Sequence, residues 1–243
     1  YILLLALSIG VLFLLNLFLG SVDIPFRSIW NILWGMDEGE SVIWQNIIWK
    51  SRVPLAFTAM VAGAGLAVSG LQMQTVFRNP LAGPSVLGIS SGASLGVAFV
   101  VLLSGSIGGI ALSRLGFMGE IALTMAAIIG ALSIMSLIVY VSQKVHGNVT
   151  LLIIGVMIGY VANAVIGVLK FFSVEEDIRA YVIWGLGSFA RVSGNQMMVF
   201  VCIMAVLFPL SFLLIKTLNL LLLGDAYARN LGLNIKRARL QVI

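Results

Sequence analysis

The chain has 243 residues, of which 60% are apolar and only 9% are charged, and its formal net charge at neutral pH is +5. Soluble domains carry roughly a quarter charged residues, so this composition excludes an ordinary soluble domain. The basic residues do not form a stripe interleaved with aromatic residues, which disfavours a nucleic-acid surface and favours a membrane facing anionic lipid. A single cysteine, Cys202, excludes an intrachain disulfide.

Apolar segments of membrane-spanning length recur along the chain. The hydrocarbon core of a bilayer is ~30 Å thick, and an α-helix needs about 20 mostly apolar residues to cross it. We therefore predict an all-α fold, a polytopic transmembrane helical bundle that forms one domain over residues 1–243. Its six spans are expected near residues 1–20, 54–77, 85–103, 117–142, 149–169 and 196–218, and residues 236–243 are expected to begin a seventh.

Three short helices are predicted outside these spans. Isoleucines mixed with Trp30 and Trp34 predict an amphipathic helix at the membrane interface, where tryptophan is favoured. A second short helix is expected over residues 178–184. In the third, Asp225 is expected to be the N-cap and Gly232 the C-terminal stop of a helix of about two turns.

The second and third spans should form a hairpin. Pro80 and Pro84 each lack a backbone donor and disfavour helical geometry in the residue before them, so one helix should end near Phe77 and another should begin near Ser85.

Glycines recur at four-residue spacing on two of the spans. They are Gly88, Gly92 and Gly96 on the third span, and Gly155 and Gly159 on the fifth, where Asn163 continues the same spacing with a single amide. This spacing allows helix backbones to approach closely in lipid. Alternatively, either face could border the path of a solute, because polar groups within spans often do. The residues alone leave both interpretations open.

No motif predicts an enzyme. Residues 88–92 fit the G-x-S-x-G pattern of a hydrolase, but a proline-rich loop precedes them in place of a strand, and the only histidine, His146, lies in another loop. No Cys or His cluster suits a metal, so we expect neither catalytic residues nor a bound cofactor in this chain.

The distribution of ionisable residues bears on the energy source of a transporter. Carriers driven by an ion gradient need ionisable groups in mid-bilayer, and the predicted span centres hold none. This absence disfavours an ion-coupled secondary transporter, which is kept as the alternative function. We favour a transporter whose energy comes from a partner protein, and the helix expected at residues 225–231 is the candidate docking element for that partner. Lys and Arg number seven on each side of the membrane, so their count leaves the orientation open.

Six segments carry a family resemblance over the whole chain, in order. They are Arg52-Val-Pro54, Ser69-Gly70 with Gln72 to Gln74, Phe77-Arg-Asn-Pro-Leu-Ala-Gly-Pro84, Leu87-Gly-Ile-Ser-Ser-Gly-Ala93, Trp184-Gly-Leu-Gly-Ser188 and Leu223-Gly-Asp-Ala-Tyr-Ala-Arg-Asn-Leu-Gly232. The chain resembles the transmembrane permeases of type II ABC importers for iron siderophores, haem and cobalamin, the FecCD or BtuC-like group.

The resemblance implies a multi-pass permease subunit of the bacterial inner membrane. It would pass a metal chelate, with an iron siderophore favoured over haem or cobalamin, from an extracytoplasmic solute-binding protein to the cytoplasm. The implied partners are a second permease subunit, either an identical copy or a close paralogue, and two cytoplasmic ATP-binding subunits that hold ATP and Mg. The family subunit has ten helices, so a chain of 243 residues is expected to be a C-terminally truncated fragment.

The resemblance also implies roles for particular residues. Arg52 would dock the binding protein; Leu55 replaces the second arginine of the family's motif, and Lys50 is a candidate substitute. The cytoplasmic gate would include Asn148, Val149 and Thr150, and residues 178–184 would form an extracytoplasmic gating helix. The coupling helix on the ATPase would place its own side in the cytoplasm, and it comprises Gly224, Asp225, Ala226, Tyr227, Ala228, Arg229, Asn230, Leu231 and Gly232.

Overall fold

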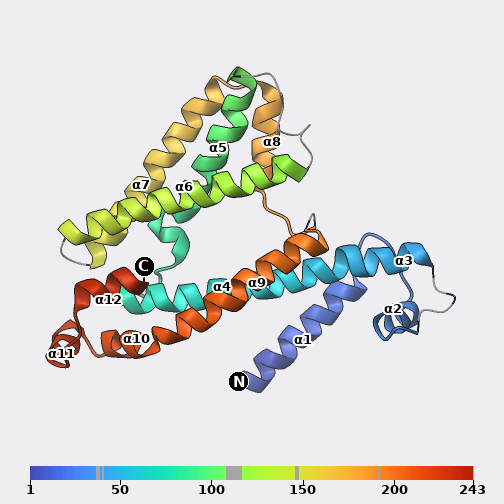
Figure 1. Ribbon diagram of the computed structural model, residues 1–243, viewed down its shortest axis with the longest axis horizontal. Helices are drawn as coiled ribbons and strands as arrows, with labels where there is room; N and C mark the ends of the chain where they lie inside the picture. The colour runs from blue at the N-terminus through green and yellow to red at the C-terminus, as the bar shows by residue number, and fades with distance from the viewer. Residues whose placement is uncertain (37–38, 40, 108–116, 146–147, 191, 243) are drawn as a thin grey trace. The chain divides into compact units, whose positions relative to one another are not determined.

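A computed structural model describes the chain apart from residues 37–38, 40, 108–116, 146–147, 191 and 243. Every regular element in the described residues is helical, which confirms the all-α prediction (Figure 1). Contacts within the chain divide it into two compact units. Unit 1 comprises Tyr1–Leu66 with Ser188–Ser211, and unit 2 comprises Ala67–Gly187 with Phe212–Ile243. That residues 1–243 form one transmembrane domain stays a prediction.

Unit 1 is built around the first helices of the chain. Its elements are α1 (Ile2–Phe18), α2 (Phe26–Leu33), α3 (Val42–Ile47), the π-helical turn η1 (Ile48–Arg52), the first half of α4 (Val53–Phe77) and most of α9 (Gly194–Leu213). A small core forms where Ile29 and Ile32 of α2 pack with Ile24 and Ile48. The predicted amphipathic helix is therefore confirmed as α2, with its isoleucines buried and its tryptophans exposed.

Unit 2 holds the remaining helices. They are the second half of α4, the 3₁₀ turn η2 (Pro84–Leu87), α5 (Ile89–Ile107), α6 (Phe117–Lys144), α7 (Asn148–Phe171), α8 (Glu175–Gly185), α10 (Ile215–Leu222), α11 (Asp225–Asn230) and α12 (Ile235–Val242). α5 lies between α7 and α8, and α6 crosses α5 (Figure 1).

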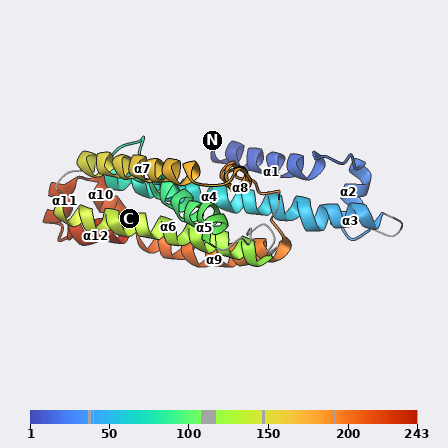
Figure 2. The same cartoon turned by 90° about the horizontal axis from the view of Figure 1, so that it is seen from above.

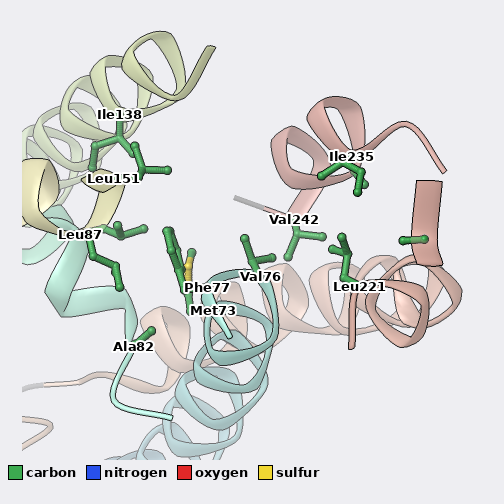
Figure 3. Close-up of a cluster of buried hydrophobic side chains, with 13 residues drawn as sticks. Met73, Val76, Phe77, Ala82, Leu87, Ile138, Leu151, Leu221, Ile235 and Val242 are labelled. Carbon is green, nitrogen blue, oxygen red and sulfur yellow. The ribbon is translucent and has the colours of Figure 1, made fainter. Parts of the chain in front are cut away.

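The larger hydrophobic core of unit 2 joins distant parts of the chain. In Figure 3, Met73, Val76 and Phe77 of α4 lie between two groups of apolar side chains. One group comes from η2, α6 and α7 and includes Leu87, and the other comes from α10 and α12 and includes Leu221. The burial of these side chains ties the C-terminal end of α4 to the elements that flank α11.

The apolar helices match the predicted spans, which confirms a polytopic membrane protein. Among the described residues, four helices are long and apolar enough to cross a bilayer: Val42–Phe77, Met118–Lys144, Thr150–Phe171 and Gly194–Leu213. Two shorter ones, Ile2–Phe18 and Ile89–Leu103, stand where the first and third spans were expected. The first of the four comprises 36 residues, because α3 and η1 continue into α4 without a break.

Two predicted boundaries are wrong. The sixth span was expected to reach Leu218, but α9 ends at Leu213, four residues after the internal Pro209, and α10 is a separate helix. A proline inside a helix removes one backbone hydrogen bond and weakens the helix locally. The third span was expected to begin near Ser85, but residues 84–87 form a 3₁₀ turn and Gly88 is left-handed at φ 73°, so α5 begins at Ile89.

Candidate functional site

The contact between α5 and α6 is made by backbone atoms. A Cβ atom added to Gly96 would lie 2.1 Å from the carbonyl oxygen of Ala126, and one added to Gly92 would lie 2.7 Å from that of Gly130. The reverse contact is closer still, because a Cβ on Gly130 would lie 2.2 Å from the carbonyl oxygen of Gly92. Only glycine fits at these three positions without moving a helix backbone.

The glycines of α7 pack in the same way against η2 and the start of α5. A Cβ on Gly88 would lie 2.9 Å from the carbonyl oxygen of Gly155, and one on Gly155 would lie 3.0 Å from the Cα of Leu87. Gly159 is also buried, with the Ser91 Oγ 3.3 Å from a Cβ placed there. The glycines on both predicted faces therefore make close helix contacts.

Gly130 was not among the packing residues predicted from the sequence. It lies four residues after Ala126 on α6, the same small-residue spacing that marked the faces on α5 and α7, and this spacing could have revealed it.

An open pocket lies where η2 and α5 meet α7. Its volume is about 290 Å³, and the side chains of Ser85, Ser91, Tyr160 and Asn163 supply its polar groups. Gly88 and Gly159 also line it, so three of the predicted face residues meet here. A second pocket of about 460 Å³, lined by Asn79 and mostly apolar residues, shares Val86 and Val156 with the first. Hydroxyl and amide groups at this place provide hydrogen bonds to water or a polar solute within a mostly apolar chain.

Asp225 at the start of α11 holds two arginines from distant segments. Its Oδ1 accepts a hydrogen bond from Arg78 Nη2 at 2.6 Å, and its Oδ2 accepts one from Arg239 Nη2 at 2.8 Å. Arg78 directly follows α4 and has a positive φ of 48°, while Arg239 lies on α12. The prediction that Asp225 is the N-cap is wrong, because Gly224 takes that position and the carboxylate is engaged by the arginines.

The C-terminal end of α11 forms a Schellman motif. Leu233 N–H donates to the Ala228 carbonyl, Gly232 N–H donates to the Arg229 carbonyl, both at 2.9 Å, and Gly232 has a φ of 87°. The predicted stop at Gly232 is confirmed. Only Ala228 of α11 is buried, whereas Tyr227, Arg229 and the C-cap residue Leu231 are exposed.

The two predicted docking residues have different surroundings. Arg52 is only 6% exposed, and its guanidinium donates to the carbonyls of Leu17 at 2.7 Å, Phe18 at 3.1 Å and Val22. It thus satisfies carbonyls that the end of α1 leaves without intrahelical donors. Lys50 is exposed. That Arg52 contacts a binding protein stays a prediction, and its burial makes Lys50 the more accessible of the two.

α8 packs on α5 at the predicted gating helix. Tyr181 is buried, its hydroxyl hydrogen-bonds to Ser94, and Lys170 Nζ lies 4.8 Å from the centre of its ring. Burial raises the pKa of the Tyr181 phenol, and the hydrogen bond to Ser94 lowers it by less. The phenol is therefore neutral at physiological pH.

The predicted cytoplasmic gate is only partly described. Asn148 begins α7, but the side chains of Asn148 and Val149 lie outside the described residues, whereas Thr150 is exposed. Within the part of the chain that the structure describes, no three His, Cys, Asp or Glu side chains gather as a metal site would require.

Comparison with known protein families identifies the family of this chain of apolar helices. The model of the FecCD transport family matches residues 6–243. The chain belongs to the FecCD transport family. This confirms the resemblance seen in the sequence, and it makes the chain a multi-pass protein of the bacterial inner membrane.

Two curated relatives of this chain carry different solutes in their names. The hemin transport system permease protein HmuU of Yersinia pestis is 34% identical over 226 residues, covering 93% of this chain and 64% of that protein. The vitamin B12 import system permease protein BtuC of Serratia proteamaculans is 34% identical over 236 residues, covering 97% and 64%. The chain thus spans 64% of the length of each of these relatives.

A solved structure has the same fold. It is described as "an inward-facing conformation of a putative metal-chelate type ABC transporter", and it matches with a TM-score of 0.75 at 27% identity. The match covers 98% of this chain and 69% of that one.

Proposed function

We propose that the chain is the membrane-spanning part of a permease subunit in an ATP-driven type II importer of metal chelates. Membership of the FecCD family carries this proposal, and the relatives named for hemin and vitamin B12 support the solute class. Both of these solutes are metal ions held in large organic rings. In this proposal, two separate cytoplasmic subunits bind ATP and Mg, and the chain itself catalyses no reaction.

The α11 helix is the proposed contact with the ATP-binding subunit. Tyr227 and Arg229 of this helix are exposed, as is its C-cap residue Leu231, and tyrosine and arginine are enriched at the centres of protein interfaces. Asp225 ties this helix to the end of α4 through Arg78, so a displacement of α11 would be passed to a membrane-spanning helix.

The proposed contact is tested by replacing its exposed side chains. We expect Tyr227→Ala and Arg229→Glu, in a reconstituted importer, to lower solute-stimulated ATP hydrolysis and uptake together. Lys216→Glu is the matched control, because Lys216 is an exposed base on the preceding helix and lies outside α11. Unchanged coupling in both α11 variants would contradict the assignment.

The proposed solute path passes the pocket of Ser85, Ser91, Tyr160 and Asn163. With Cys202 replaced by serine, single cysteines at Ser91 and Asn163 should react with a charged, water-soluble thiol reagent, and solute should slow the reaction. A cysteine in place of Val161, an exposed α7 residue outside the pocket lining, is the control. Equal rates at all three positions would remove the pocket from the path.

The particular chelate is a finer proposal. We propose an iron siderophore, with haem and cobalamin as the alternatives. Uptake of radiolabelled iron siderophore, competed by unlabelled haem or cobalamin, distinguishes them. Dependence on an ion gradient at constant ATP would instead favour a secondary transporter.

A further inference from the structure

Four aromatic rings form a continuous ladder at the end of α1. Phe18 stacks on Phe26 with ring centres 4.6 Å apart, Phe26 stacks on Trp30 at 6.3 Å, and Trp30 meets Trp34 at 5.8 Å. Phe26 and Trp30 of α2 and Trp34, the C-cap residue of this helix, are spaced four residues apart, so they lie on one side of the helix. They are 64%, 46% and 65% exposed, respectively.

The opposite face of α2 is buried in the core of unit 1. Ser28, Ile29 and Ile32 are buried, and the two isoleucines pack against Ile48 of η1. This packing fixes the rotation of α2, so the aromatic face cannot turn inward without breaking the core of unit 1. The exposure of the ladder is therefore a property of the folded unit.

The height of the ladder relative to the bilayer follows from α1. The apolar helix α1 ends at Phe18, where Arg52 binds the carbonyls of Leu17 and Phe18, so Arg52 marks the level at which α1 ends. Ile48, which α2 covers, precedes Arg52 by four residues, roughly one helical turn. α2 therefore lies about one turn beyond the end of a membrane helix, and Figure 2 shows it at that end of α1, beside α3. This is the zone of glycerol and headgroups, where tryptophan rings are favoured.

We propose that Phe18, Phe26, Trp30 and Trp34 form a phospholipid-binding ladder that fixes the depth of the α1–α2 corner in its leaflet. Arg27, exposed and adjacent to Phe26, can reach a lipid phosphate from the same helix. The ring faces then cover the first carbons of the acyl chains, and the Trp indole N–H groups donate to ester or phosphate oxygens. The proposal rests on the membrane location of α1 and is independent of the transported solute.

Quenching by brominated phosphatidylcholine tests the ladder. In the protein reconstituted into such vesicles, Trp34 is kept and the other four tryptophans are replaced by phenylalanine. We expect bromines near the glycerol end of the acyl chain to quench Trp34 about twofold more than bromines near the methyl end. A protein that keeps only Trp44, which packs against the isoleucine core, is the matched control and should be quenched less.

Two outcomes overturn the proposal. Quenching of Trp34 by aqueous acrylamide without quenching by bromolipid would place the ladder in water, where a soluble partner could bind it. Resistance to both quenchers would show that another protein segment covers it. If the multiply substituted protein does not fold, the difference between the parent and Trp34→Phe proteins yields the same comparison.

Discussion

Two charged contacts hold helix ends in this protein, and they differ in burial. Arg52 is almost wholly enclosed and uses its guanidinium on three backbone carbonyls, whereas Asp225 is partly exposed and pairs with two arginine side chains that are themselves partly exposed. Removing a buried donor leaves acceptors unsatisfied, whereas water can replace an exposed ion pair. The Arg52 contact is therefore expected to contribute more to the stability of the fold than the Asp225 contact, which links α11 to Arg78 and Arg239 at a smaller energetic cost of breakage.

The largest effect should come from Arg52. Arg52→Ala leaves the carbonyls of Leu17, Phe18 and Val22 without this donor, and we expect the free energy of unfolding to fall by about 2–4 kcal/mol. Denaturant unfolding in detergent measures it. Lys50→Ala, two residues away and exposed, should change stability by less than ~0.5 kcal/mol. Equal losses of stability in both variants would show that the burial of Arg52 does not increase its contribution to stability.

The contact between α5 and α6 involves no charged group. Gly96→Ala would place a methyl group 2.1 Å from the Ala126 carbonyl oxygen, and we expect a loss of about 1–3 kcal/mol from the forced separation of α5 and α6. The same unfolding measurement applies to this variant. Stability at or above that of the parent would show that these helices are not held by close approach.

Asp225 should have a smaller effect on stability. Asp225→Asn removes the charge that both arginines share, and half-exposed pairs of this kind contribute about 0.2–1 kcal/mol. Because salt screens exposed charges, the difference from the parent should shrink as ionic strength rises. A loss as large as that of Arg52→Ala, or one insensitive to salt, would show that the pair is effectively buried.

The smallest effect is expected at Gly167 on α7. A Cβ there meets no atom within 4 Å, and alanine favours a helix over glycine by up to about 1 kcal/mol. Gly167→Ala should therefore leave stability unchanged or raise it slightly. It is the matched control for Gly96, and a clear destabilisation would indicate a neighbour contributed by another chain.

Local signals predicted most of the fold. Pro80 and Pro84 end one helix near Phe77, and Gly232 stops α11, because each acts on the backbone within a few residues. The apolar runs located six helices because membrane-spanning length is a property of the segment itself.

Contacts between distant residues were not predictable in this way. Asp225 was assigned to the cap of its own helix, but its partners lie 147 and 14 residues away, and nothing in the local sequence names them. Arg52 was recognised by its motif, yet its burial depends on how η1 meets the end of α1. Likewise, the small-residue faces indicated close packing without showing which helices they join.

The glycine contacts of α5 have a consequence for motion. Where two helices touch through backbone atoms, side chains cannot rearrange to accommodate sliding, so α5, α6 and α7 are expected to move as one rigid body. Conformational change during a transport cycle would then be concentrated in hinges at other places, where helices are interrupted or joined by turns. The left-handed turn at Arg78 and the break after Leu213 are two such places in the described chain.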